Sequence, residues 1–335
     1  MSITAKELAK MMNLSEAAVS MALRNKSGVS TQTRLKVLAL AEEHGYDFSK
    51  VTKPNVESKH ITFAIYRRHH SSIVGDTPFF AELSEGIETA CAENQYKLHV
   101  TYIHKNEDVQ KKTEDIASSD CAGLILLGTE MLLEDFKPFK DLRVPVVVLD
   151  TYLDFGDCDC VLINNVQGAQ IATDYLINRT KKQPGYLRSA YPLGNFDERE
   201  DGFYRAVRRH GMSKSKTIVH SLTPSVEGAF ADMMEIMEQG DELAPCYFAD
   251  NDWIAIGAMK AFQKKGLKIP EDIAIVGFDN IPMAAYMEPS LTTVHVPKKY
   301  MGKMAVKRLI DVIQNDEHYP IKLEVSTKLK KRRTC

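Results

Sequence analysis

The chain of 335 residues is 44% hydrophobic and 26% charged, with a formal net charge of −2. This composition is typical of a globular protein, and the length permits more than one domain. No apolar run approaches the length of a membrane span, and the start at Met1–Lys6 lacks the basic and apolar regions of a secretory signal. These features exclude a membrane or secreted protein, so we expect a cytoplasmic one.

The charge is distributed unevenly. Residues 1–59 hold nine Lys or Arg against six Asp or Glu, whereas the rest of the chain holds 34 against 39. A mildly basic N-terminal part on an acidic body suits phosphate contacts made from one end only. A face of this charge can equally be no more than solvated.

The cysteines indicate neither a disulfide framework nor a zinc site, because no C-x-x-C pair occurs among them. We expect most of them to be reduced core residues. Cys158-Asp159-Cys160 is better explained as a loop or strand end than as part of a metal site. We therefore predict no metal and no cofactor. The six positions are Cys91, Cys121, Cys158, Cys160, Cys246 and Cys335.

The first 45 residues predict two short helices around a tight turn. Thr4 and Glu7 have the spacing of a capping box at the start of the first helix. Its apolar stripe is expected from Leu8, Met11 and Met12. Such a hairpin can offer one helix to a DNA major groove, although an ordinary helical hairpin has the same pattern.

The turn and the next two helices carry their own signals. Asn13 suits a left-handed turn, Ser15 and Ser30 suit the N-caps of the second and third helices, and Gly45 suits the end of the third. On the second helix the inward set is expected to be Ala18, Val19, Ala22 and Leu23. The open side is then left to Glu16, Ala17, Ser20, Met21 and Arg24.

Beyond Tyr46 the apolar periodicity fails until Ile61, which predicts a linker. Short apolar runs and helical patterns alternate after it, as expected for parallel strands joined by crossover helices. The expected strands are Ile61–Tyr66, Leu98–Ile103, Gly123–Leu127, Val144–Leu149, Gly185–Leu187, Thr217–His220, Cys246–Ala249 and Ile273–Phe278. Helices are expected at Phe80–Glu93, Glu200–Arg209, Gly228–Glu238 and Trp253–Lys265. This alternation predicts two doubly wound lobes.

Motifs along nearly the whole chain resemble, in order, those of the lactose-repressor (LacI/GalR) family of bacterial transcription regulators. In the headpiece they are Val19–Ser30, Thr33-Arg34, Val37 and Gly45-Tyr46. In the body they are Pro78–Phe80, Gly86–Glu88, Gly123–Ile125, Pro145–Val147, Asn164-Asn165, Arg199, Gly202-Phe203, Asn251-Asp252, Ala255, Gly257, Val276–Asn280 and Leu291–Val294.

The resemblance implies an all-α helix-turn-helix headpiece followed by an α/β, periplasmic-binding-protein-like domain with two doubly wound parallel sheets. The implied headpiece is 1–48, the linker or hinge is 49–59, and the effector-binding and dimerisation domain is 60–335. Because the family's chain crosses between its lobes three times, the first lobe is expected at 60–162 and 294–322. The second is then expected at 163–293 and 323–335. Ligands of such folds bind at the carboxyl ends of the strands, here between the lobes.

By the same resemblance, the DNA-binding positions are Thr4, Ser15, Glu16, Ala17, Ser20, Met21, Arg24, Asn25, Thr33 and Arg34. Glu16, Ala17 and Met21 are implied to face bases. Ala17 and Met21 offer only apolar contact, for example to a thymine methyl group. Glu16 can accept a hydrogen bond from a cytosine amino group, or it can simply be an acid in the first turn of a helix.

The linker departs from the family pattern. The family usually folds a hinge helix there on operator DNA, but the matching positions in this chain include Thr52-Lys53-Pro54-Asn55. A proline at that depth of a short helix costs about 3 kcal/mol. We therefore expect no hinge helix of the usual kind and less bending of the DNA.

The implied effector-binding residues are Phe79, Phe80, Thr151, Asn195, Arg199, Thr223, Trp253 and Asp279. Asp279 can accept hydrogen bonds from ligand hydroxyls, and Arg199 can donate to the same ligand or to a carboxylate. Phe79, Phe80 and Trp253 can present flat faces to a sugar ring or be ordinary core residues.

The sequence thus predicts a dimeric, DNA-binding transcription regulator, in particular a repressor of a carbohydrate-utilisation operon. Its effector is expected to be a sugar or sugar phosphate that closes the lobes and changes the spacing of two headpieces on a palindromic operator. The main alternative is a cytoplasmic sugar sensor with weak or lost operator binding. An enzyme finds no support, because no nucleophile and base pair, phosphate loop or metal spacing is present.

Overall fold

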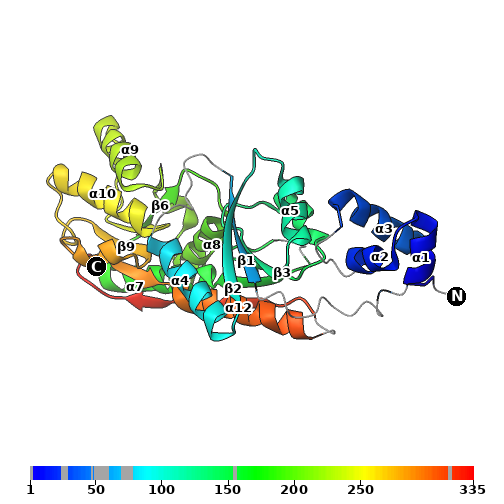
Figure 1. Cartoon of the computed structure of the whole chain (residues 1–335). Coiled ribbons are helices and arrows are strands. Elements are labelled where there is room, and N and C mark those ends of the chain that lie inside the picture. The colour runs from blue at the N-terminus through cyan, green and yellow to red at the C-terminus, as the bar shows by residue number, and fades with distance from the viewer. Residues whose placement is uncertain are drawn as a thin grey trace.

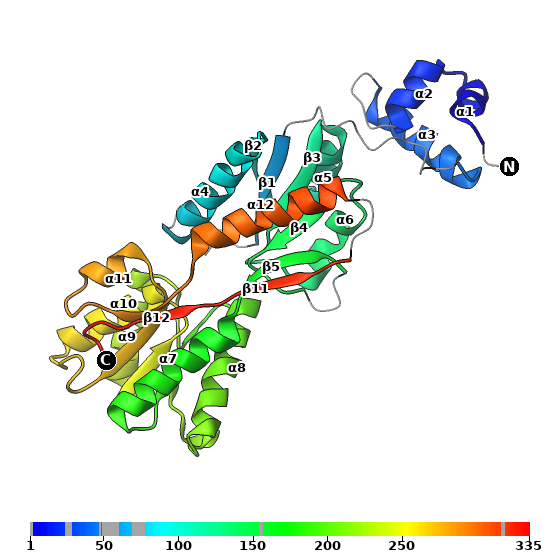
Figure 2. The same ribbon diagram turned by 90° about the horizontal axis from the view of Figure 1, so that it is seen from below.

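The computed structural model describes residues 3–23, 29–46, 48, 60–68, 78–153, 157–315 and 319–335. The headpiece lies at one end of the molecule, the first lobe lies in the middle and the second lobe lies at the other end (Figure 1 and Figure 2). The predicted linker at 49–59, with Pro54 and Asn55, falls outside the described residues. Within the described ranges, no helix is long and apolar enough to cross a bilayer.

The headpiece is a bundle of three helices, α1 (Ala5–Met12), α2 (Glu16–Leu23) and α3 (Thr31–Glu43). Its core joins Leu8 of α1, Val19 of α2 and Val37 of α3, each fully buried. A separate small core of this kind holds the three helices together independently of the lobes.

The first lobe is a six-stranded sheet in the order β11-β5-β4-β3-β1-β2, and all neighbouring strands in it are parallel. Its strands are β1 (His60–Arg67), β2 (Lys97–His104), β3 (Cys121–Leu127), β4 (Val146–Leu149), β5 (Asp159–Ile163) and β11 (Lys322–Val325). Helices α4 (Pro78–Glu93) and α12 (Lys298–Gln314) cover one face. Helices α5 (Val109–Ser118) and α6 (Lys137–Lys140) and the short 3-10 helix η2 (Leu133–Phe136) cover the other. Side chains of β1 alternate between the two cores, as a sheet covered on both faces requires.

The second lobe repeats this plan with the order β12-β10-β9-β8-β6-β7. Its strands are β6 (Gly185–Ser189), β7 (Val219–Leu222), β8 (Cys246–Ala249), β9 (Ala274–Asp279), β10 (Thr292–His295) and β12 (Lys328–Lys330). Helices α7 (Asn165–Thr180) and α8 (Gly194–Arg209) cover one face, and α9 (Val226–Gln239) and α10 (Asp252–Lys264) cover the other. The short helices η3 (Lys214–Lys216) and α11 (Pro282–Tyr286) lie in its connections. Strand β12 is antiparallel to β10. The prediction of a wholly parallel second sheet is therefore wrong at this strand.

The chain passes between the lobes three times, as expected, but at later positions than predicted. Ile163 pairs within the first sheet, residues 294 and 295 pair within the second, and residues 323–325 pair with β5 in the first. The predicted lobe boundaries after residues 162, 293 and 322 are therefore wrong, and each lies one to three residues too early in the chain. The chain leaves each sheet only where a strand ends, because an earlier exit would leave buried backbone N–H and C=O groups without hydrogen-bond partners. Figure 2 shows the last crossing as the red segment that joins β11 to β12.

Five of the six cysteines are buried, as expected for core residues, and Cys335 is half-buried. The Sγ atoms of Cys158 and Cys160 lie 3.6 Å apart beside the first-lobe core. In the described part of the chain, no group of three or more His, Cys, Asp or Glu side chains is arranged to hold a metal ion.

Candidate functional site

The predicted caps and turn of the headpiece are present in the structure. Thr4 Oγ1 accepts a hydrogen bond from the Glu7 backbone N–H at 3.3 Å, and a Glu7 carboxylate oxygen accepts one from the Thr4 N–H at 2.7 Å. The bonds from Thr4 lower the pKa of the Glu7 carboxyl. Asn13 has φ 53° and ψ 42°, and Ser15 Oγ accepts from the Ala18 N–H at 3.1 Å. The turn between α1 and α2 is therefore fixed by local interactions.

The predicted headpiece core is mostly right, with two errors. Met11 is 53% exposed, and Ala9 is buried in its place on α1. The reason is helical geometry: Leu8, Ala9 and Met12 face α2 and α3, which turns position 11 outward. Ala18, expected inside, is only half-buried.

The outward face of α2 carries few polar groups. Glu16 and Ala17 are exposed, whereas Ser20 and Met21 are half-buried. The Glu16 carboxylate lies 4.0 Å from the Lys6 ammonium, and both side chains are largely exposed. This face is available to an external partner, which is what the predicted base-reading positions need.

The other predicted DNA-binding residues lie in different settings. Thr33 is half-buried, and its Oγ1 is 2.7 Å from Ser30 Oγ at the start of α3. Arg34 is only 7% exposed, and desolvation lowers its pKa while Asp120 opposes that shift. Arg24 and Asn25 lie outside the described residues. Phosphate contacts by these residues stay a prediction.

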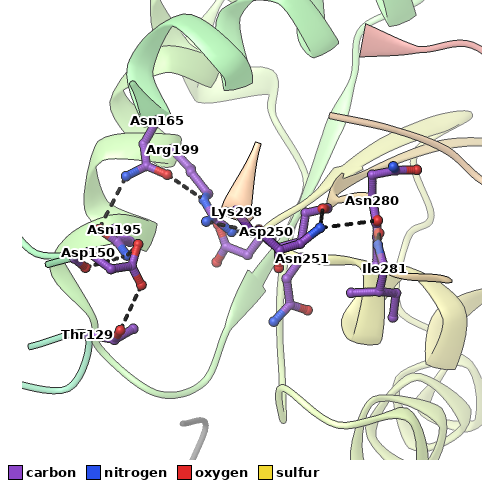
Figure 3. Close-up of polar contacts among 12 residues, drawn as sticks. Thr129, Asp150, Asn165, Asn195, Arg199, Asp250, Asn251, Asn280, Ile281 and Lys298 are labelled. Atoms are coloured by element: carbon purple, nitrogen blue, oxygen red, sulfur yellow. Dashed lines mark hydrogen bonds and ion pairs between the residues drawn. The ribbon is translucent and has the colours of Figure 1, made fainter. Parts of the chain in front are cut away.

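A cluster of buried polar side chains joins the two lobes, and we call it the interlobe network. Its members lie at or near the carboxyl ends of strands, or at the starts of helices that face them (Figure 3). Because the carboxyl ends of parallel strands meet at one edge of a sheet, the two sheets bring these side chains together there. The network consists of Thr129, Asp150, Asn165, Asn195, Arg199, Asp250, Asp279 and Lys298.

Arg199 is the centre of the second-lobe part of the network. It is 3% exposed, and its Nε donates to Asn165 Oδ1 at 2.9 Å while its Nη1 donates to the Asp250 carbonyl at 2.5 Å. Its guanidinium also lies 3.8 Å from the centre of the Phe278 ring. A buried arginine held at these points keeps a fixed orientation.

Asp279, at the end of β9, is placed beside this arginine. Its Oδ1 lies 3.2 Å from Arg199 Nη2, yet no donor among the described residues reaches this buried oxygen with hydrogen-bond geometry. Burial raises the pKa of Asp279, while Arg199 and Lys298 oppose the shift. Its backbone has φ 102°, an unusual conformation for a residue with a side chain. The carboxylate therefore retains capacity to accept a hydrogen bond from a ligand.

Asp150 and Asn195 join the lobes directly. Asn195 Nδ2, on α8, donates to the Asp150 carbonyl at 3.1 Å and to its Oδ1 at 3.3 Å. Thr129 Oγ1 donates to the other carboxylate oxygen at 2.7 Å, and Asn165 Nδ2 donates to Asn195 Oδ1 at 3.2 Å. Complete burial raises the pKa of Asp150 to about 7. A relative movement of the lobes must therefore break or replace these bonds.

Asp250 and Asp252 are tied to the protein more fully. Asp250 accepts from the Tyr186 hydroxyl and, at 2.6 Å, from the Ser189 N–H. Asp252 accepts from Thr293 Oγ1 at 2.6 Å and from the Ile281 N–H at 2.9 Å. Burial raises their pKa values to about 7 and about 8. These acids hold the loops that follow β8 and β9 and so position Asp279.

Lys298, at the start of α12, makes a second connection between the lobes and was not predicted from the sequence. It is 1% exposed, and its Nζ donates to the carbonyls of Asp279 at 2.9 Å and Asn280 at 3.4 Å. Glu82 of α4 lies 3.5 Å from the same ammonium. Thr129, Asp150 and Asp250 were also not predicted, and Asn165 was known only as part of a family motif, because their roles depend on pairing between distant segments.

The structure brings together three of the predicted effector residues, Asn195, Arg199 and Asp279, within the network. Phe79 and Phe80 are at most 9% exposed and pack edge to face in the first-lobe core, with Phe79 5.6 Å from the Lys298 ammonium.

The remaining predicted effector residues lie in other settings. Trp253 is half-buried against the second-lobe core. Thr151 is buried next to Asp150, and the Thr223 N–H donates to Asp232 at 2.6 Å. Ligand contact by all these residues stays a prediction.

Family models match both parts of the chain. Residues 4–48 match the description "Bacterial regulatory proteins, lacI family", and residues 173–335 match "Periplasmic binding protein-like domain". The chain is 31% identical over 345 residues to the HTH-type transcriptional repressor PurR of Proteus mirabilis, covering 99% of this chain and 96% of that protein. It is thus a member of the lacI family of bacterial regulatory proteins.

Solved structures agree with this fold. The transcriptional regulator CelR in complex with cellobiose has a TM-score of 0.72 at 22% identity, covering 99% of this chain and 100% of that one. The lac repressor dimer bound to operator has a TM-score of 0.70 at 19% identity, covering 100% and 99%. These likenesses show the fold, a two-lobed body with an N-terminal helix-turn-helix.

Proposed function

We propose that the protein is a cytoplasmic, homodimeric repressor that binds palindromic operator DNA with two headpieces and releases or gains it when a sugar binds between the lobes. The single observation that carries this proposal is the interlobe network, in which buried polar side chains of both lobes meet around an incompletely bonded carboxylate, Asp279. It favours a ligand rich in hydroxyl groups, since Asp279 can accept and Arg199 is a fixed donor.

The network also supplies a means of coupling. The bonds from Asn195 to Asp150 and from Lys298 to Asp279 cross from one lobe to the other. A sugar that makes its own bonds to these groups stabilises one arrangement of the lobes over another. Operator DNA also selects one arrangement through the spacing of the headpieces, so the two ligands influence each other. The CelR complex with cellobiose supports a sugar as the effector class.

The headpiece residues expected to contact DNA are those of the predicted set. Glu16, Ala17 and Met21 would face bases, whereas Ser20, Thr33, Arg34 and Asn25, the last outside the described residues, would lie nearer the phosphates. The exposure of Glu16 and Ala17 supports this assignment.

Selection of genomic DNA fragments by the purified protein at near-physiological salt tests the proposal. Recovery of one palindromic site, with an affinity that changes when a mono- or disaccharide from a panel including cellobiose is added, is the expected result. Binding that is independent of sequence and disappears with added salt would contradict a repressor.

A sugar sensor with weak or lost operator binding is the second candidate. It is favoured by one observation: α2 has no basic residue. In that case the sugar would bind and stabilise the lobes, but no DNA site would be enriched.

A further inference from the structure

The outward face of α2 lacks the side chains that recognise purines. Specific contacts to guanine use Arg or Lys on O6 and N7, and those to adenine use Asn or Gln on N6 and N7. The sequence of α2 over Glu16–Leu23 contains none of these four residue types. Arg24 and Asn25 follow the helix outside the described residues and take no part in this inference.

The face offers two apolar groups instead. Ala17 is exposed and Met21 is half-buried, so the methyl group of one and part of the thioether side chain of the other are accessible. They lie four residues apart, about one helical turn, and hence on the same side of α2. Two apolar groups at this spacing can reach neighbouring or next-but-one base pairs in a major groove, where successive pairs are about 3.4 Å apart.

Polar alternatives on this face are limited. Glu16 only accepts hydrogen bonds when ionised, and its carboxylate already has the Lys6 ammonium 4.0 Å away. Ser20 is half-buried and supplies one hydroxyl group. The base recognition that Ala17 and Met21 themselves can supply is therefore contact with the one apolar feature of the major groove, the C5 methyl group of thymine.

We propose that Ala17 and Met21 recognise thymine in each operator half-site through its C5 methyl group. This inference rests on the proposed operator binding. Specificity at these two positions then comes from van der Waals contact with the thymine methyl group and from the exclusion of water from it. Removal of that methyl alone, with all base pairing kept, must weaken binding.

Deoxyuridine scanning of the selected operator tests the inference. Each thymine of a half-site is replaced in turn by deoxyuridine, and the affinity of the full-length protein is measured by fluorescence anisotropy. At the contacted thymines the affinity should fall about fourfold per methyl group, as expected for one buried carbon. Deoxyuridine outside the half-sites should have no effect.

Variants assign the effect to residues. Met21→Ala and Ala17→Ser should each bind the unmodified operator more weakly and should lose sensitivity to deoxyuridine at one position. Met11→Ala is the matched control, because Met11 is an exposed apolar residue of α1 away from the outward face of α2. It should keep the full deoxyuridine effect.

The outcomes separate the two proposals. An enriched operator whose affinity is unchanged by deoxyuridine at every thymine overturns methyl recognition alone. Deoxyuridine effects that persist in both Met21→Ala and Ala17→Ser also overturn it, because other residues would then make the contact. If no DNA site is enriched at all, the proposed operator binding fails and the inference fails with it.

Discussion

The outward face of α2 and the interlobe network differ in burial and in chemistry. The first is exposed at Glu16 and Ala17 and half-buried at Ser20 and Met21, and it has no strong hydrogen-bond donor. The second is almost wholly buried and contains one arginine, one lysine and three aspartates. Substitutions on the headpiece surface should therefore cost little stability. The buried polar groups of the network, in contrast, need hydrogen-bond partners and counter-charges within the protein even without a ligand.

The largest effect is expected from breaking the network at its centre. Arg199→Ala removes the donors to Asn165 and Asp250 and leaves the buried Asp279 carboxylate without its cation. The free energy of unfolding of the second lobe should fall by about 3–5 kcal/mol. Urea denaturation measures this. Arg205→Ala, on the same helix but exposed, is the control and should change stability by no more than about 0.5 kcal/mol. Equal losses in the two variants would refute the central place given to Arg199.

The headpiece should respond to core changes without affecting the lobes. Leu8→Ala creates a cavity in a fully buried position and should destabilise the headpiece by about 3 kcal/mol. Met11→Ala should cost no more than about 0.5 kcal/mol, since that side chain is 53% exposed. Proteolysis of the headpiece, followed by mass spectrometry, reports both. A comparable increase in cleavage for both variants would contradict the core described above.

The network should also give the lobes a pH dependence opposite in sign to that expected from Glu7 in the headpiece, whose lowered pKa makes stability fall as the pH falls. Burial raises the pKa of Asp150 from its ordinary 3.8 to about 7. The folded state therefore holds this proton more tightly than the unfolded chain, and stability decreases as pH rises from about 4 to about 7. In Asp150→Asn this decrease should become smaller by up to about 1.4 kcal/mol per pH unit. Urea denaturation at several pH values measures the slope, and Asp201→Asn, a half-buried acid of α8 paired with Arg205, is the control variant.

The smallest effect is expected at the first cap of the headpiece. Thr4→Ala removes the acceptor for the Glu7 N–H and should cost about 1 kcal/mol of headpiece stability. Thr4→Ser keeps the hydroxyl and should behave like the original protein. Headpiece proteolysis compares the two variants, and indistinguishable cleavage would show that the capping box contributes nothing.

Features of the headpiece that depend on local interactions could be predicted from the sequence. Thr4, Asn13 and Ser15 act on partners within four residues, so their roles follow from local spacing. Eight strands follow, in whole or in part, from apolar runs, whereas β5, β10, β11 and β12 were not predicted. The prediction that Met11 belongs to the core was wrong, because in so short a helix the position of the neighbouring helices decides which apolar residues are buried.

The interlobe network was largely hidden from the sequence. The family resemblance supplied Asn195, Arg199 and Asp279, but the bond from Asn195 to Asp150 joins residues 45 positions apart. Lys298 is recognisable only once α12 is seen to begin beside the end of β9. The lobe crossings were placed too early, because strand pairing, which single-chain periodicity does not reveal, decides where each strand ends.

Control of operator binding by a sugar at the interlobe network is tested by measuring operator affinity by anisotropy with and without the active sugar of the panel, for the original protein and for Asp279→Asn. We expect a shift of at least about fivefold in the original protein and none in the variant, which should still bind the operator. An equal shift in both proteins, or no shift in either, would contradict it.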